Sequence, residues 1–420
     1  MSHQTTPTFP VASTGSEGSP RATKAPRVVF IHEVSYLDKP VFEMHEFPEG
    51  LSASGWKVDF VDFGEHAARS RRHREPASRL GAGHIDLSTV PSVGSGILRR
   101  LIAVLVGSVW IPWQLCRWKP DIVVLYAVPT FGWQTVLAAR VLGIPVVYRA
   151  IDLSSEIRET VFGRLVSWAE RVVARRATIV CSNTDQLGDH LRSLGATDVR
   201  RVFPGFDRQS PEQTRGDPDA EEPSAHHIPG SVVFMGTLFP FAGLKHIIHV
   251  MAPMLRRRPD VKLRILGSGE AESAIRNVIE RESLTDSIEM PGFVPYEQLF
   301  DELSRSSVAV IPFDERTLTH VALPGKVPQY IRAGLPVVST PLRGLQELLP
   351  EGIGVTYRPM GAGFVDAIEE LLSDPEHRNR LVEAGNERLD AVATWEIALT
   401  EFESVLCDAI RKTQGESDVG

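Results

Sequence analysis

Short apolar runs alternate with amphipathic stretches along most of this 420-residue chain. In the first half, runs rich in valine, isoleucine and aromatic residues predict buried strands at residues 27–33, 56–63, 121–126, 145–148 and 178–181. Stretches with helical periodicity separate them at residues 42–54, 131–142 and 162–175. Because strands and helices alternate, this half predicts a doubly wound parallel sheet.

A change in composition divides the chain into two such units. Residues 207–230 contain four prolines among acidic and small polar residues, which predicts a linker. New apolar runs follow at residues 231–235, 262–266, 308–312 and 335–340. The sequence therefore predicts α/β domains at residues 27–206 and 231–394 and a final helix at residues 395–412. The ends read as a disordered leader without a signal-peptide core, residues 1–26, and a tail, residues 413–420.

The composition is that of a soluble globular protein, with 42% hydrophobic and 23% charged residues. Three widely separated cysteines indicate neither a disulfide framework nor a zinc site, and they favour a reducing, cytoplasmic compartment. The formal net charge of −8 argues against general binding to nucleic acid.

The segment LPGKVPQYIRAGLPVVST, residues 323–340, carries the clearest chemical signal. Pro324 and Gly325 open a predicted helix, and Lys326 and Gln329 share one face of its first turn. A lysine beside the unpaired N–H groups of a helix start favours an anion, and a diphosphate uses both. The alternative is an ordinary surface helix with a solvated lysine.

This segment resembles the nucleotide-sugar site of GT-B glycosyltransferases, in which two Rossmann-like domains face each other across a cleft. The shared pattern is proline–x–lysine–x–x–(glutamate or glutamine)–tyrosine, followed by alanine–glycine–x–proline–valine–valine. Most of the large family 4 has glutamates at the positions of Val321 and Gln329. Lysine followed by glutamine is more similar to the group of the xanthan-pathway glucuronosyltransferase, an inverting enzyme whose two residues contact the donor nucleotide. The resemblance implies that the final helix packs back across the first domain.

Two glycine turns extend the expected donor site. Gly236 and Thr237 follow a strand, where a missing side chain lets a phosphate approach backbone N–H groups; a routine strand-to-loop glycine is the alternative. Phe293 and Val294 resemble the segment that frames the nucleotide base, although Phe293 also fits a core position. The glycines of Gly267-Ser268-Gly269 read as structural. The expected donor-binding residues are Gly236, Thr237, Phe293, Val294, Pro324, Gly325, Lys326 and Gln329.

An inverting transfer needs a base, and Asp152 is the candidate. It follows the strand at residues 145–148, at the sheet edge where ligands bind in open α/β folds. Asp152 could instead cap a following helix, and a retaining mechanism would leave it only a binding role. Glu43, His45 and Glu46 are candidates for acceptor binding or for the base, and two of them also fit an ordinary solvated helix surface.

Residues 99–119 combine an uncharged stretch with three tryptophans and basic flanks. The stretch is short for a membrane span, and Pro112 is expected to break its helix. It could dock on the inner leaflet or lie buried against the first sheet. Nearby arginines could contact anionic lipid or face water; they are Arg69, Arg71, Arg72, Arg74 and Arg79.

Together these features predict a glycosyltransferase that moves a sugar from a nucleotide-diphosphate donor, UDP-linked and with UDP-glucuronate as one option. The acceptor would be a glycan or lipid-linked molecule in bacterial polysaccharide or glycolipid assembly. No paired carboxylates of a metal site stand at a strand end, so no metal or other cofactor is expected. The alternatives are a sugar-nucleotide epimerase of the same fold and a non-catalytic nucleotide-sugar-binding partner.

Overall fold

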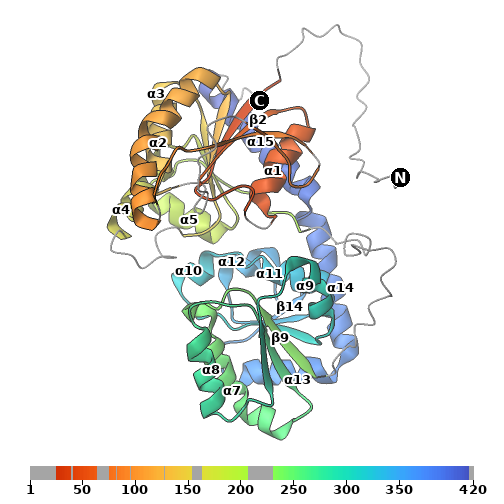
Figure 1. Cartoon of the computed structure of the whole chain (residues 1–420). Coiled ribbons are helices and arrows are strands. Elements are labelled where there is room, and N and C mark those ends of the chain that lie inside the picture. The colour runs from red at the N-terminus through yellow and green to blue at the C-terminus, as the bar shows by residue number, and fades with distance from the viewer. Residues whose placement is uncertain are drawn as a thin grey trace, which may run out of the picture.

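The computed structural model describes residues 25–38, 41–63, 75–81, 83–94, 96–126, 128–153, 163–206 and 230–415. These residues form two α/β domains, each built around one twisted sheet with helices on both faces (Figure 1). Almost all of the predicted linker and leader lies outside the described residues, as do Arg69, Arg71, Arg72 and Arg74.

The N-terminal sheet has the spatial order β3-β4-β2-β1-β5-β6-β7-β8, and β3 alone runs antiparallel to its neighbour. Its strands are β1 (Arg27–Ile31), β2 (Lys57–Asp62), β3 (Glu75–Ala77), β4 (Ile85–Thr89), β5 (Ile122–Leu125), β6 (Val146–Ala150), β7 (Ile179–Ser182) and β8 (Val199–Arg201). The five predicted strands are confirmed. The sequence pattern missed β3, β4 and β8, which are short or contain charged residues.

Alternate residues of β1 face two separate cores. Val28 and Phe30 pack with the helices α1 (Glu43–Ala53) and α15 (Trp395–Gln414). Val29 and Ile31 face the opposite core, whose helices are α2 (Gly96–Trp118), α3 (Gly132–Val141), α4 (Gly163–Arg176) and α5 (Asp185–Ser193). A strand buried on both faces reads as a continuous apolar run, which explains why β1 was visible in the sequence.

The predicted helix break at Pro112 is wrong, because α2 continues through it for 23 residues. A proline removes one backbone hydrogen bond, here the bond to the carbonyl of Ser108. Ile111 and Leu115 are buried on the sheet on either side of it, and these contacts hold the helix together.

The C-terminal sheet is entirely parallel in the order β11-β10-β9-β12-β13-β14. Its strands are β9 (Ser231–Met235), β10 (Lys262–Leu266), β11 (Ile288–Gly292), β12 (Val308–Ile311), β13 (Val337–Ser339) and β14 (Val355–Tyr357). Its helical elements are η1 (Pro240–Ala242), α7 (Leu244–Arg257), α8 (Glu272–Arg281), α9 (Tyr296–Ser304), α10 (Thr317–Val321), α11 (Lys326–Arg332), α12 (Arg343–Leu348), α13 (Ala362–Ser373) and α14 (Pro375–Val392). The strand order reverses between β9 and β12, and ligands of such sheets bind beyond the carboxyl ends of the strands at this switch point.

The final helix, α15, crosses back to the N-terminal domain, as the resemblance implied (Figure 1). Phe402 is fully buried and stacks on Phe47 of α1 with ring centroids 4.4 Å apart. The indole N–H of Trp56 donates to Glu403 at 2.7 Å. The last element of the chain therefore completes the first core.

The carboxyl edges of the two sheets face each other. The Thr184 hydroxyl, just beyond β7, donates to the carbonyl of Val321 in α10 at 2.7 Å. The Glu347 carboxylate of α12 accepts from the backbone N–H groups of Asp185 and Gln186 at 2.5 and 2.9 Å. An anion at the start of α5 is favourable because the first N–H groups of a helix are unpaired. Residues that follow strands in the two domains therefore share one interdomain space.

A buried ion pair connects α1 to the sheet. Both oxygens of Glu43 accept from the Arg149 guanidinium of β6 at 2.9 Å, and both side chains are fully buried. Arg149 also donates to the carbonyl of Val202 at 2.8 Å. A bidentate pair with further hydrogen bonds compensates for much of the cost of removing two charges from water.

Glu43→Gln is expected to lower stability by about 3–5 kcal/mol, because it leaves the Arg149 charge buried without a counter-ion. Urea denaturation followed by circular dichroism measures this effect. Glu46→Gln, on the same helix but only half-buried, serves as the control. A Glu43→Gln protein with wild-type stability but weak acceptor binding would contradict the structural role.

Phe402→Ala is expected to destabilise the N-terminal domain by about 3–5 kcal/mol, because it leaves a cavity between α15 and the sheet. The measurement is the midpoint of thermal unfolding. Ser404→Ala changes an exposed residue of the same helix and should leave that midpoint unchanged. Equal midpoints for the two variants would show that α15 adds little to the core.

Candidate functional site

Lys326 lies at the switch point of the C-terminal sheet. Its ammonium stands 4.7 Å from the ring centroid of Phe234 in β9 and 5.0 Å from that of Phe313, just beyond β12. A Cβ atom on Gly236 would lie 2.3 Å from the Lys326 nitrogen, and Gly236 has a φ of +133°. The positive φ therefore requires glycine at the end of β9, and a side chain there would also displace the Lys326 ammonium.

The ammonium of Lys326 is partly desolvated but not neutralised. Its side chain is half-buried, and burial lowers the pKa of Lys326 to about 8. Within the described residues, its ammonium contacts two aromatic faces and no carboxylate. Aromatic faces stabilise a cation only modestly, so an anion bound here would gain a strong partner. The solvated-lysine alternative is wrong.

The other residues of this segment lie around Lys326. Gly325 is the N-cap of α11, and Lys326 is its first residue, two positions later than predicted. Gln329 is half-buried one turn further along, while Pro324 is buried. The Tyr330 hydroxyl accepts from the backbone N–H of Met235 at 2.6 Å, which fixes α11 against the end of β9.

The ends of β9, β10 and β11 form a contiguous glycine-rich edge. A Cβ atom on Gly267 would lie 2.0 Å from the carbonyl oxygen of Gly236, which confirms the structural reading of Gly267. The N–H of Gly267 donates to the carbonyl of Gly292 at 2.7 Å. Thr237, beyond β9, is exposed, so this edge is open to a ligand.

Phe293 follows β11 at this edge. Its side chain is 76% exposed, so the alternative of a core residue is wrong. Val294, by contrast, packs against the core of the C-terminal domain. A free aromatic face beside a glycine-rich edge is suited to stacking on a nucleotide base.

The switch point of the N-terminal sheet, between β1 and β5, holds polar residues that sequence reasoning missed. The rings of His32 and Tyr126 stack with centroids 5.0 Å apart. The Glu33 carboxylate accepts from the N–H groups of Val128 and Thr130 at 3.1 and 2.6 Å, and burial raises the pKa of Glu33. The sequence feature that could have identified His32 and Glu33 is their position directly after the first strand.

Asp152 lies two residues beyond β6, at the same edge. Its side chain reaches solvent, yet surrounding protein atoms desolvate it and, with the charge of Glu43, raise the pKa of Asp152 to about 6. The Asn183 amide donates to the carbonyl of Ile151 at 2.9 Å and so holds this turn. The segment that Asp152 was alternatively expected to cap, Leu153-Ser154-Ser155-Glu156, lies outside the described residues from Ser154 onward.

Glu43 and His45 are fully buried, so the alternative that two of the three candidates are solvated helix residues is wrong. Nδ1 of His45 accepts from the N–H of Phe42 at 3.1 Å, and its Nε2 lies 2.7 Å from the carbonyl oxygen of Tyr36. Burial lowers the pKa of His45, which favours the neutral ring that these contacts require. Glu46 is half-buried. Acceptor binding by Glu43 or His45 stays a prediction, and it requires their present partners to release them.

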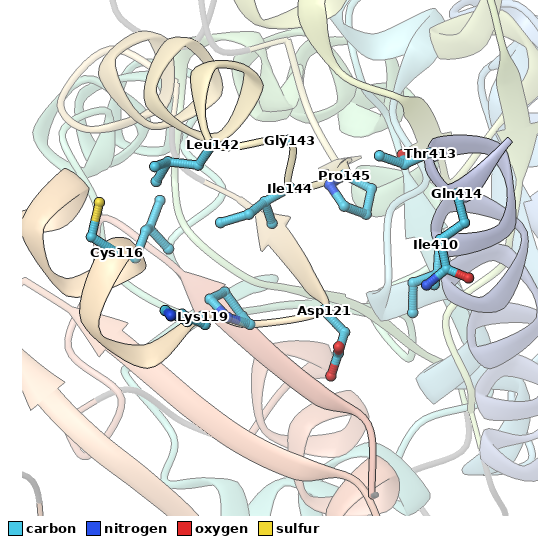
Figure 2. Close-up of a pocket in the computed structure, with 12 residues that line it drawn as sticks. Cys116, Lys119, Asp121, Leu142, Gly143, Ile144, Pro145, Ile410, Thr413 and Gln414 are labelled. Atoms are coloured by element: carbon cyan, nitrogen blue, oxygen red, sulfur yellow. The ribbon is translucent and has the colours of Figure 1, made fainter. Parts of the chain in front are cut away.

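A separate cavity lies at the opposite edge of the N-terminal sheet. Figure 2 shows this pocket of about 480 Å³, which is lined by the ends of α2, α3 and α15 and by the segments before β5 and β6. It contains Lys119 and Asp121, and the Asp121 carboxylate accepts from the backbone N–H of Arg27. None of the predicted site residues lines it, so the pocket is distinct from the candidate site.

Two family models match the chain in succession. The model described as Glycosyl transferase 4-like domain matches residues 42–205, and the model described as Glycosyl transferases group 1 matches residues 221–388. The two matches correspond to the two α/β domains.

The individual relatives share only low sequence identity with this chain. The chain is 26% identical over 260 residues to alpha-D-kanosaminyltransferase of Streptomyces kanamyceticus, covering 59% of this chain and 66% of the relative. It is 26% identical over 210 residues to the putative colanic acid biosynthesis glycosyltransferase WcaL of Salmonella typhimurium, covering 50% of each. The chain thus spans between half and two thirds of the length of these relatives.

Solved structures share the whole fold. Sucrose-phosphate synthase from Thermosynechococcus elongatus superposes with a TM-score of 0.70 at 14% identity, over 92% of this chain and 100% of that one. HepE from Anabaena, solved with UDP, gives 0.67 at 14% identity over 91% and 100%. A putative UDP-N-acetylglucosamine 2-epimerase from Listeria monocytogenes gives 0.57 at 13% identity over 94% and 98%. At these identities the likeness concerns the fold alone.

The family matches in both domains, the two facing parallel sheets and the crossing final helix agree with one another. They confirm the predicted fold class, and the chain belongs to the GT-B glycosyltransferases.

Proposed function

We propose that this protein transfers a glycosyl group from a nucleotide-diphosphate sugar to a glycan or lipid-linked acceptor in bacterial polysaccharide or glycolipid assembly. The observation that carries the proposal is the half-buried Lys326 ammonium, which faces the switch point without a carboxylate partner among the described residues. A diphosphate supplies the missing negative charge. Thr237 is exposed directly after Gly236, so the proposed phosphates would lie at this open strand end beside Lys326.

The nucleoside would extend from Lys326 along the glycine edge toward Phe293. Stacking on the exposed Phe293 ring and contact with Gln329 would orient the base and the ribose. We propose a uridine nucleotide, with UDP-glucuronate as one donor. The UDP bound by HepE, a protein of the same fold, supports this choice of nucleotide.

The reaction proposed is a single displacement at the anomeric carbon. The acceptor oxygen forms a bond to that carbon while the bond to the donor diphosphate breaks, and Asp152 takes the proton from the acceptor hydroxyl. The electron pair leaves with the diphosphate, whose charge Lys326 stabilises, so the proposed step requires no metal ion. With a pKa of about 6, Asp152 is deprotonated and ready to act as a base at neutral pH.

A non-catalytic nucleotide-sugar-binding protein is the competing function. Neither glutamate that most of family 4 carries is present, since Val321 and Gln329 occupy those positions. Val321 is buried, and its carbonyl takes part in the contact with Thr184 of the other domain. A thermal-shift panel of nucleotide-sugars identifies the donor, because a ligand that binds only the folded state raises the unfolding temperature. Hydrolysis or transfer of that donor would then distinguish a glycosyltransferase from a non-catalytic binding protein and from an epimerase.

Lys326→Ala is expected to weaken donor binding by about 1.5–3 kcal/mol, because the diphosphate loses a charged hydrogen-bond partner. Isothermal titration calorimetry measures the change. Lys245→Ala, at an exposed lysine of α7, is the matched control.

Wild-type affinity for the donor should also fall as pH rises through about 8, where Lys326 loses its proton. The Lys326→Ala variant should lack this pH dependence. Equal affinities for wild type and Lys326→Ala would exclude the role of Lys326.

Asp152→Asn is expected to lower turnover roughly a hundredfold or more with little change in donor affinity, because the amide cannot accept the proton. In the wild type, turnover should fall as pH drops below about 6, where Asp152 becomes protonated. Initial rates at saturating donor, measured from pH 5 to pH 8, test both statements. A stable Asp152→Asn protein with near-normal rates would rule out Asp152 as the base.

A further inference from the structure

Helix α2 has two apolar faces, and one of them is buried against the described part of the N-terminal domain. Ala103, Ile111 and Leu115 are buried against the N-terminal sheet. Trp110 also packs on this side, against Trp118. The predicted core role of residues 99–119 is therefore correct for half of the helix.

The opposite face is an exposed apolar stripe. Five side chains, three or four residues apart, are between 51% and 73% exposed: Leu98, Leu101, Leu105, Val109 and Trp113. This spacing places them along one side of a helix over roughly 22 Å at 1.5 Å per residue. Soluble helices normally turn such a stripe inward.

Among the described residues, one segment, Leu98–Trp118, is long and apolar enough to cross a membrane, and 22% of its apolar window is buried. A core helix of a soluble protein would be mostly buried. The contacts of Ile111 and Leu115 with the sheet nevertheless keep α2 in the domain, so the helix can lie on a bilayer but cannot span it.

Helix α4 extends the apolar surface. Leu165 and Trp168 are 53% and 45% exposed, and the Trp168 ring contacts Trp133 of α3 with centroids 5.5 Å apart. Helix α3 packs against both α2 and α4. We call the five α2 residues together with Leu165 and Trp168 the α2–α4 face.

The charges on these helices are almost all positive, although the whole chain carries −8. Helix α2 has three arginines, α3 has one and α4 has four. Six of them are exposed, namely Arg117, Arg140, Arg164, Arg171, Arg175 and Arg176. The one acidic residue of the three helices, Glu170, is buried. Tryptophan and leucine surrounded by arginine complement the headgroups and acyl chains of an anionic lipid layer.

The α2–α4 face also reaches the candidate site. In a βαβ unit a helix runs antiparallel to the strand that follows it, so α2 and α4 begin at the carboxyl edge of the sheet. Leu98, Leu101 and Leu165, in the first turns of these helices, therefore lie at the edge that holds Asp152. A surface resting on this face would lie beside the entrance for an acceptor.

We propose that the α2–α4 face docks on an anionic lipid bilayer, with α2 parallel to the membrane at the inner face of the cell membrane. The evidence for docking comes from the α2–α4 face alone. Only the delivery of a lipid-linked acceptor rests on the proposed function. A second copy of this chain is the weaker occupant, because two such faces would bring arginines against arginines.

The test is co-sedimentation with vesicles of phosphatidylcholine alone or mixed with phosphatidylglycerol, without donor or acceptor. The wild type should bind only the anionic vesicles. Leu105→Ser combined with Val109→Ser, and separately Arg164→Glu combined with Arg171→Glu, should each weaken this binding roughly tenfold or more. All four residues are exposed, so unfolding temperatures should stay at the wild-type value.

Arg281→Glu combined with Arg380→Glu, at exposed sites of the C-terminal domain, makes the same change in net charge and should leave vesicle binding intact. Equal losses in this control would overturn the assignment to the α2–α4 face. Failure of the wild type to bind anionic vesicles would overturn the proposal. If the wild type self-associates and the variant with Leu105→Ser and Val109→Ser does not, the face belongs to a contact with a second copy. Because the assay involves no donor, its result is independent of the proposed reaction.

Discussion

A desolvated ammonium, for which the described residues supply no carboxylate partner, lies at the switch point of the C-terminal domain. Lys326 is held over Gly236 between two phenylalanine rings, and its pKa of about 8 records the cost of that burial. Three features surround this side chain at the end of β9: the glycine there, the hydrogen bond from Met235 to Tyr330, and the switch point between the neighbouring strands β9 and β12. A site arranged in this way favours a ligand that supplies concentrated negative charge.

The N-terminal domain handles its buried charge in the opposite manner. Glu43 and Arg149 neutralise each other inside the protein, and their contacts fix α1 against β6. The negative charge of Glu43 is nevertheless felt by Asp152, where it adds to desolvation in raising the pKa. A structural ion pair therefore also tunes the group proposed as the base, and the two charged sites face each other through the contacts of Thr184 and Glu347.

The N-terminal domain also exposes an apolar face on helix α2. Helix α2 packs one side on the sheet and leaves Leu105 and Val109 in solvent, and the arginine-rich helix α4 follows beyond α3. An exposed apolar surface of this kind is typical of a site that a membrane or another protein covers. The candidate site and the proposed docking face share the carboxyl edge of one sheet, so the path proposed for a lipid-linked acceptor is short.

Strands buried on both faces, such as β1, β5, β9 and β12, could be located from sequence because their apolar runs are continuous. The lysine segment could also be recognised, since helix start, lysine and following strand are local features. The burial of Glu43 was not predictable, because Arg149 lies far away in the chain and comes beside it only through the parallel sheet. The same holds for the continuity of α2 through Pro112 and for its exposed face, which depend on contacts with the sheet. Local chemistry was therefore determined by the sequence, whereas the tertiary structure decided which charges are paired and which surfaces are free.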